Sequence, residues 1–339
     1  MKGTVFVTGG AGFIGFHLIK SLLINNINVV AVDNLNSYYS VDLKKARLEE
    51  IKTLNGQFNF YLGDIEDTNF LNNIFKRYEP KYVVNLAAQA GVRDSIKNPG
   101  LFLKSNINGF GNILEICKDY DISHLVYASS SSVYGGNRQL PYSEKNSVDH
   151  PVSIYAASKK SNELMAHVYS HIYSLPATGL RFFTVYGPWG RPDMSYFLFT
   201  KAILENRAID IFNYGKMKRD FTFIDDIVES IVRVIKKIPI SNEKFNRNNP
   251  DLSTSWAPHR IFNVGNSTSI NLDYFISTLE EIIGKKAIKN LLPMPKGDVQ
   301  STLADTNLLE EYINFKPKTK LKEGLQKFVL WYKDFYKIV

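Results

Sequence analysis

A glycine-rich turn near the start of the chain constrains its fold more than any other feature. The segment VFVTGGAGFIGFHLIKSLL joins a β-branched apolar run at 3–8 to an amphipathic stretch at 13–25, and it carries Gly9, Gly12 and Gly15. Glycines at this spacing, between a strand pattern and a helix pattern, are typical of the tight turn that opens a parallel α/β sheet. We therefore expect the chain to begin with the first strand and helix of such a sheet.

The rest of the first half repeats the same alternation of strand and helix patterns. Its apolar runs are rich in valine and nearly continuous, which is typical of strands covered by helices on both faces. Further strands are expected at 27–33, 58–62, 81–87 and 124–129, and a helix at about 100–120. This alternation predicts right-handed crossovers and an α/β fold of the Rossmann type, with a doubly wound parallel sheet.

The pattern is less regular in the second half. The run at 177–187 predicts one more core strand, and the polar, Asn-rich segment 241–258 predicts a surface loop. Helices are expected at 195–206, 225–237, 271–284 and 319–337. We predict that residues 1–180 form the Rossmann domain. Residues 181–339 are expected to form mainly a smaller C-terminal α/β lobe that binds substrate, with some segments returning to the first domain.

Composition narrows the class of partner. The net charge is +8 and the pI about 9.2, which is compatible with a polyanionic partner. The lysines are spread along the chain, however, so nucleic acid is not expected and a small dianionic substrate fits better. No apolar run reaches the roughly 18 residues of a membrane span, so no membrane contact is expected. The single cysteine, Cys117, cannot form an internal disulfide and indicates a reducing, cytoplasmic location.

The glycine segment has the features of a dinucleotide site. Gly9 permits the turn, Gly12 lets the backbone approach a pyrophosphate, and Gly15 lets helix and strand pack closely. Asp33 ends the next expected strand, where its carboxylate can accept hydrogen bonds from both ribose hydroxyls and would repel a 2′-phosphate. These features predict NAD rather than NADP as the cofactor. The other residues expected to contact it, some of which also fit ordinary strand-to-loop transitions, are Phe13, Ile14, Asn34, Asp64, Ile65, Ala87, Ala88 and Gln89.

Tyr155 and Lys159 form a candidate catalytic pair. The segment SIYAASKKSNE places them four residues apart in a predicted helix, and therefore on one helix face. An unperturbed tyrosine has a pKa of about 10 and is a poor base at neutral pH. A nearby ammonium, together with the positive nicotinamide ring, would stabilise the phenolate, and Lys159 can also hold the nicotinamide ribose. The alternative is a surface helix in which the spacing is accidental.

With these residues the chain resembles the extended short-chain dehydrogenases/reductases, a superfamily of NAD-dependent nucleotide-sugar epimerases, dehydratases and decarboxylases. The resemblance covers essentially the whole chain and includes TGGAGFIG, the Tyr155–Lys159 pair and KRDFTFIDDI at 218–227. It implies an NAD that stays bound through turnover and a sugar nucleotide that is oxidised at C4.

A serine run discriminates among the members of this superfamily. By the resemblance, 4,6-dehydratases carry an Asp-Glu pair after the catalytic Ser or Thr, and UDP-glucuronate decarboxylases carry a glutamate before Val-Tyr-Gly. Here the corresponding stretch, SSSVYG at 130–135, contains no carboxylate. Both reactions are therefore disfavoured, and epimerisation is favoured. We expect Ser130 to relay a proton and Ser131 and Ser132 to contact the substrate.

Four longer segments are similar to the UDP-glucuronate 4-epimerases in particular: 33–48, 87–95, 182–203 and 212–227. The resemblance implies that Thr184 and Arg191 face the sugar carboxylate, which a guanidinium can hold through two parallel hydrogen bonds. It also implies that Arg219, and with it Arg93, binds the diphosphate. The alternatives are ion pairs, of Arg191 with Asp193 and of Arg219 with Asp220 or Asp225. The Asn-rich loop and GDVQST at 297–302 depart from the family pattern, which leaves the uridine contacts open.

The expected reaction interconverts UDP-glucuronate and UDP-galacturonate through a transient 4-keto sugar, with tightly bound NAD. Three alternatives remain open: a 4-epimerase of a neutral sugar (UDP-glucose or UDP-N-acetylglucosamine), a UDP-glucuronate decarboxylase, and a non-catalytic NAD-sensing protein. His167 and His171 lie one helical turn apart but without a third ligand nearby, so no metal is expected. The family suggests a homodimer formed through the helices near 100–120 and 155–173.

Overall fold

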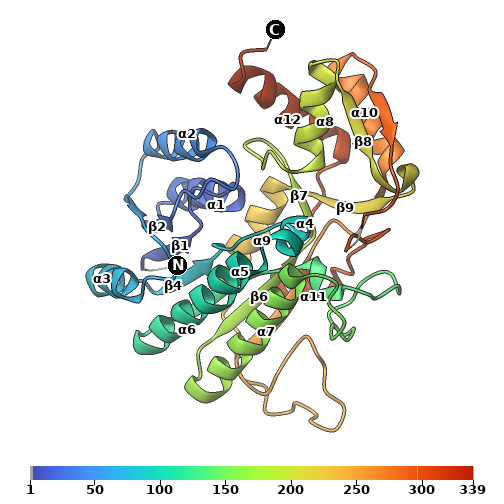
Figure 1. The fold of residues 1–339 in the computed structure, drawn as a ribbon. Helices are drawn as coiled ribbons and strands as arrows, with labels where there is room; N and C mark the ends of the chain where they lie inside the picture. Colours follow the sequence, from blue (N-terminus) through green and yellow to red (C-terminus); the bar gives the residue numbers. More distant parts are fainter. Residues whose placement is uncertain (1–2, 296, 339) are drawn as a thin grey trace.

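The computed structural model, which describes residues 3–295 and 297–338, is built around a seven-stranded parallel sheet. Its strand order is β10-β6-β5-β4-β1-β2-β3, and every neighbouring pair is parallel. The strands are β1 (Val5–Thr8), β2 (Val29–Asp33), β3 (Phe58–Leu62), β4 (Tyr82–Asn85), β5 (His124–Ser130), β6 (Ala177–Phe182) and β10 (His259–Val264). This arrangement confirms the predicted doubly wound α/β fold (Figure 1).

Helices cover both faces of this sheet, as the nearly continuous apolar strands require. On one face α1 (Phe13–Ile24) packs with α9 (Ile224–Lys236), and Val5 and Val7 of β1 point toward them. On the other face Phe6 packs against α3, α6 and α7. The first-half helices are α2 (Val41–Lys52), α3 (Thr68–Tyr78), α4 (Val92–Lys97), α5 (Pro99–Phe102), the π-helical segment η1 (Leu103–Gly109), α6 (Phe110–Asp119), the 3-10 turn η2 (Ser131–Tyr134) and α7 (Ile154–Tyr173).

Part of the second half forms a separate group of small sheets and helices beside this layer, whereas β10, α9 and α11 (Asn307–Ile313) lie in or against the large sheet (Figure 1). A three-stranded sheet has the order β11-β9-β7, and β12 pairs with β8 in parallel. The strands are β7 (Thr184–Tyr186), β8 (Ala208–Ile211), β9 (Lys218–Phe223), β11 (Ser269–Asn271) and β12 (Ile288–Leu291). The helices are α8 (Ser195–Leu204), the turn η3 (Phe212–Gly215), α10 (Leu272–Ile283) and α12 (Leu321–Phe335).

Several features of the second half differ from the expectation, since the strands β8, β9, β11 and β12 and the helix α11 were not predicted individually. The single strand predicted at 177–187 is two strands, β6 and β7, because the chain leaves the large sheet at Phe183 and joins the small one. The strand β10 was not predicted, yet it completes the edge of the large sheet beside β6. The division of the chain at residue 180 stays a prediction. Among the described helices none is both long enough and apolar enough to cross a membrane.

Candidate active site

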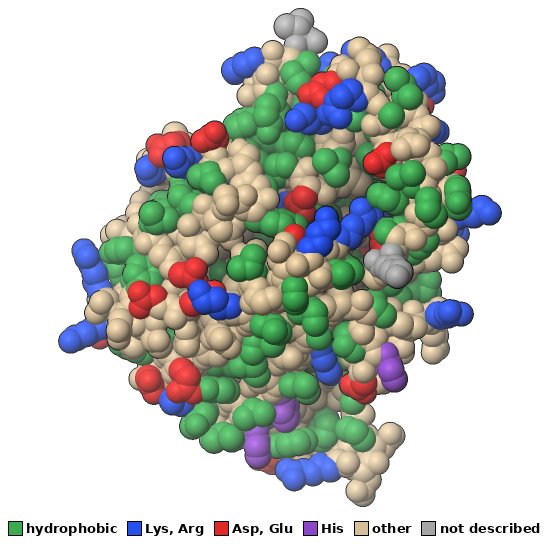
Figure 2. All heavy atoms as spheres, viewed as in Figure 1, with side chains coloured by type: hydrophobic (Ala, Val, Ile, Leu, Met, Phe, Trp, Pro, Cys, Tyr) green, Lys and Arg blue, Asp and Glu red, His purple; other side chains and the backbone are tan. Residues whose placement is uncertain are grey.

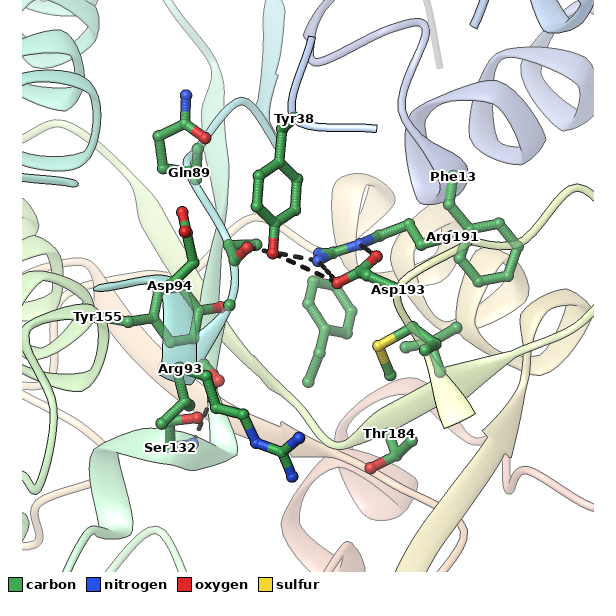
Figure 3. Close-up of a pocket in the computed structure, with 18 of the residues that line it drawn as sticks. Phe13, Tyr38, Gln89, Arg93, Asp94, Ser132, Tyr155, Thr184, Arg191 and Asp193 are labelled. Atoms are coloured by element: carbon green, nitrogen blue, oxygen red, sulfur yellow. Dashed lines mark hydrogen bonds and ion pairs between the residues drawn. The ribbon is translucent and has the colours of Figure 1, made fainter. Parts of the chain in front are cut away.

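A cavity of about 1040 Å³ lies at the carboxyl ends of β1, β4 and β5, facing the second lobe. Ligands of open parallel sheets bind at this edge. Figure 2 shows basic side chains near the centre of this face, and Figure 3 shows residues that line the pocket. Every candidate catalytic, cofactor-binding and substrate-binding residue lines it, and the cofactor candidates are Gly9, Gly12, Phe13, Ile14, Gly15, Asp33, Asn34, Asp64, Ile65, Ala87, Ala88 and Gln89.

The glycine-rich loop has no room for side chains. Gly9 has a φ of 69°, and a Cβ on Gly15 would lie 2.2 Å from the Gly9 carbonyl oxygen. A Cβ on Gly12 would lie 2.9 Å from the same oxygen. Gly12 also precedes the first residue of α1 and offers no side-chain cap, so the first amide groups of that helix stay free. Such a loop fits a pyrophosphate at the helix N-terminus.

Asp33 lies at the end of β2, beside this loop. Its Oδ2 accepts a hydrogen bond from Ala11 N at 3.1 Å, and its Oδ1 accepts one from Leu35 N at 2.8 Å. Burial raises the pKa of the carboxyl above its usual range, and these amides and the charge of Lys44 oppose the shift. Asn34 donates to Asp64 Oδ2 at 2.8 Å, which joins the ends of β2 and β3. The Asp33 carboxylate fits the ribose hydroxyls and would repel a 2′-phosphate.

Tyr155 and Lys159 lie in the first turns of α7, whose N-cap Ser153 accepts a hydrogen bond from Ala156 N at 3.1 Å. The Lys159 ammonium is buried and donates to the Ala128 carbonyl of β5 at 2.8 Å. Burial lowers its pKa to about 8. Burial also raises the pKa of Tyr155, and the Ser130 hydroxyl and the charge of Arg191 counteract this shift. The Lys159 ammonium thus points toward β5 and not toward the Tyr155 hydroxyl.

The four serines at 129–132 differ in their hydrogen bonds and in their exposure. Ser129 donates to Glu163 Oε1 at 2.7 Å. Ser130 accepts a hydrogen bond from Ser132 N at 3.1 Å and caps η2. Ser131 and Ser132 are half-buried and line the cavity. The run is therefore a rigid end of β5, with its second to fourth hydroxyls available to a ligand.

A buried polar network that the sequence analysis missed contacts the serine run through Ser129 and Glu163. Glu163 is held by Arg181 through two hydrogen bonds of 2.8 and 2.9 Å. Arg181 also donates to the Tyr134 hydroxyl at 3.0 Å, and Tyr134 donates to Asn263 Oδ1 at 2.6 Å. The signal in the sequence was a charged residue, Arg181, within the apolar run of a central strand. A guanidinium there must be neutralised, because burying an unpaired charge is costly.

The cavity arginines are engaged with carboxylates. Arg191 donates to Asp193 through Nε at 3.0 Å and Nη2 at 2.6 Å, and Tyr38 lies against both (Figure 3). Arg93 and Arg219 share Asp298, at 3.2 and 2.8 Å.

The ion pair of Arg191 with Asp193 is thus present, and the partner of Arg219 is Asp298. Asp220 is buried and accepts backbone hydrogen bonds from Asn266 and Ala304. Thr184, on β7, lines the same cavity.

The two histidines of α7 contact the Asn-rich loop. His167 Nε2 lies 2.7 Å from the Ser255 hydroxyl, and His171 Nδ1 accepts from Trp256 at 3.0 Å. Among the described residues no group of three or more His, Cys, Asp or Glu side chains could hold a metal ion. Segment 241–258 therefore docks on α7 through its last residues.

The chain as a whole is similar to known proteins. The NAD dependent epimerase/dehydratase family matches residues 5–246. The chain is 51% identical over 333 residues to Protein CapI of Staphylococcus aureus, covering 98% of this chain and 99% of that one. It is 45% identical to the probable UDP-glucuronate 4-epimerase of Rhizobium meliloti, covering 98% and 97%. A crystal structure of UDP-glucuronic acid 4-epimerase from Bacillus cereus, with UDP-glucuronic acid and NAD, is 32% identical with a TM-score of 0.87, covering 98% and 100%.

Proposed function

Since this chain belongs to the NAD-dependent epimerase/dehydratase family, we propose that it is a UDP-glucuronate 4-epimerase, interconverting UDP-glucuronate and UDP-galacturonate with NAD as its cofactor. The observation that carries this proposal is the composition of the cavity. Tyr155, Lys159 and Ser130 line it together with Arg191. The carboxylate that reaches the serine run, Glu163, is neutralised by Arg181 and cannot act as the free acid or base that an elimination requires.

Tyr155, Ser130 and Lys159 have different roles in the reaction at C4. When bound, NAD supplies the acceptor and donor for the hydride at C4 of the sugar. Tyr155, as the phenolate, takes the proton of the C4 hydroxyl. The keto sugar then turns its other face to the cofactor, and Tyr155 returns the proton to the C4 oxygen. Ser130 keeps its own proton for the same sugar oxygen, because its Oγ already accepts from Ser132 N. Lys159 donates one of its three N–H groups to the Ala128 carbonyl, so the other two can bind the nicotinamide ribose.

The substrate is held at two charged positions. Arg93 and Arg219 bind the diphosphate, whose charge replaces that of Asp298 between them. Arg191 and Thr184 bind the sugar carboxylate, and Ser131 and Ser132 contact the sugar ring. A neutral hexose would leave Arg191 with Asp193 alone, so the anionic sugar gains more from this cavity.

The test is incubation of the purified protein with UDP-glucuronate and no added NAD. We expect proton NMR to show UDP-galacturonate appearing until both sugars are at equilibrium, because NAD stays with the protein. UDP-galacturonate as the starting material should reach the same mixture. UDP-glucose is the matched control, and we expect its turnover to be at least tenfold slower. Conversion of UDP-glucose alone, or a pentose as the main product, would contradict the proposal.

We further propose that the protein is a homodimer formed through the helical region 100–120, which comprises the end of α5, η1 and α6, and through α7. Leu164, Val168 and Ile172 repeat at four-residue spacing along α7 and are 56%, 47% and 60% exposed. Leu101 and Leu103 add exposed apolar surface beside them. A stripe of this kind on a soluble helix favours burial against a second copy. Light scattering should give twice the chain mass of 38.6 kDa, and Val168→Glu should shift the protein toward the monomer. A monomeric native protein at micromolar concentration would refute this assembly.

A further inference from the structure

Arg47, on α2, is a buried cation outside the catalytic cluster. Its side chain is 0% exposed. Nη1 donates to the Ala11 carbonyl at 2.8 Å and to the Tyr39 hydroxyl at 2.6 Å. Nε and Nη2 donate to the Trp189 carbonyl at 3.1 and 2.6 Å, and Nη2 also donates to the Gly190 carbonyl at 3.2 Å. The whole guanidinium fork is therefore used to hold other segments of the chain.

Among the residues that the structure describes, no carboxylate accepts a hydrogen bond from Arg47, although its charge acts on the buried Asp33 carboxylate at the end of β2 and helps to lower the pKa of that group. All of its hydrogen-bond acceptors are backbone carbonyls and one phenol. Arg181, which is also fully buried, is instead paired twice with Glu163. Burying an unpaired cation is costly, so Arg47 leaves a positive potential in its surroundings. Ala11 belongs to the glycine-rich loop, where the free N-terminus of α1 also attracts an anion.

The three segments that Arg47 joins belong to different parts of the site. Ala11 lies in the phosphate-binding loop, and Tyr39 lies in the segment that follows β2. Trp189 and Gly190 directly precede Arg191. Trp189 has a positive φ of 60°. The centroid of its ring lies 5.2 Å from that of Phe16 on α1 and 5.3 Å from that of Trp331 on α12. A shift of the Arg47 side chain would therefore move the cofactor loop and the Arg191 loop together.

We propose that Arg47 is a positioning residue that ties the phosphate-binding loop to the Arg191 loop, so that NAD retention and substrate binding depend on one another. This role rests on the proposed function for its substrate half and on the dinucleotide site alone for its cofactor half. The cofactor pyrophosphate adds negative charge, beyond that of Asp33, near a buried guanidinium that has no carboxylate hydrogen-bond partner of its own. Bound NAD in turn stabilises the loop geometry that presents Arg191 to the sugar.

The test is Arg47→Lys, which keeps the charge and loses the planar fork. We expect the purified variant to carry roughly tenfold less NAD per chain than the native protein, because two or more hydrogen bonds are lost. NAD is quantified after denaturation, in the absence of any sugar. Added NAD should restore activity, and the KM for UDP-glucuronate should stay raised several-fold. Added NAD should also raise the Tm of the variant more than that of the native protein.

Arg233→Lys is the matched control. Arg233 also donates to two backbone carbonyls, of Ile313 and Asn314, and pairs with Glu229 on α9, away from the cavity. We expect it to lower the Tm without changing NAD content. Native NAD content and native KM in Arg47→Lys would overturn the proposal, as would an equal NAD loss in the control.

A second variant keeps the test decisive if Arg47→Lys does not fold. Tyr39→Phe removes one acceptor of Arg47 and should lower NAD content by a factor of roughly 2 to 10. Unchanged NAD content in Tyr39→Phe would count against the proposed link between the phosphate-binding loop and the Arg191 loop. An inactive native protein that still holds NAD would contradict the epimerase proposal and leave the cofactor half of this one standing.

Discussion

Tyr155→Phe is expected to lower kcat by roughly 10³-fold, because it removes the hydroxyl that we propose to take and return the C4 proton. The change deletes one hydroxyl and leaves the ring in its T-shaped contact with Phe102, 6.2 Å between centroids. The Lys159 contact with Ala128 does not involve the phenol and should persist. Turnover of UDP-glucuronate, followed by NMR at saturating substrate, measures the loss.

The control for this variant is its cofactor. Because the glycine loop and Asp33 are untouched, NAD content and Tm should equal those of the native protein. Ser130→Ala should be milder, with a loss of roughly 10-fold to 100-fold, since the backbone amide of Ser132 can then bind water instead. If Tyr155→Phe retained more than a tenth of native kcat, another base would have to be sought, and the assignment of the pair would fail.

Arg191→Ala is expected to raise the KM for UDP-glucuronate by on the order of 100-fold and to release a new product. The loss of affinity follows from removing a bidentate, charge-assisted pair. The new product follows from the chemistry of the intermediate. A 4-keto sugar with a carboxylate on C5 is a β-keto acid. When its C5–C6 bond stands perpendicular to the carbonyl, that bond breaks, CO₂ leaves, and the electron pair forms an enolate that is protonated at C5.

We therefore expect a UDP-4-keto-pentose, detected by mass spectrometry, with an equal amount of NADH on the protein. The reason is that we propose Arg191 to hold the carboxylate near the carbonyl plane, where this bond is not aligned for cleavage. Arg191→Lys keeps the charge without the fork and should give an intermediate amount of keto-pentose. Asp193→Asn removes the internal competitor and should lower the KM without changing the product. Unchanged affinity and no keto-pentose in Arg191→Ala would show that the carboxylate is held elsewhere.

Much of the fold could be predicted because its signals are local. The glycine spacing and the valine-rich runs report on turns and on strands covered on both faces, and these depend on residues close in the sequence. The strand β10 escaped prediction because β7, α8, β8, β9, α9 and a polar loop separate it from its partner β6, and no local pattern encodes that pairing. The break at Phe183 has the same cause, since β7 pairs with β9 in the small sheet and not with a strand of the large one.

By itself the sequence determined the cofactor half, the Tyr155–Lys159 face and the absence of an acid in the serine run, because each depends on residue type at short spacing. Only the tertiary structure decided how the charges pair. It brought Glu163 to Ser129 and neutralised it with Arg181. It gave Arg219 a partner 79 residues away and held Arg47 against a carbonyl 142 residues away. Electrostatic interactions act through space, so the partners of a charged side chain are known only when the chain is folded.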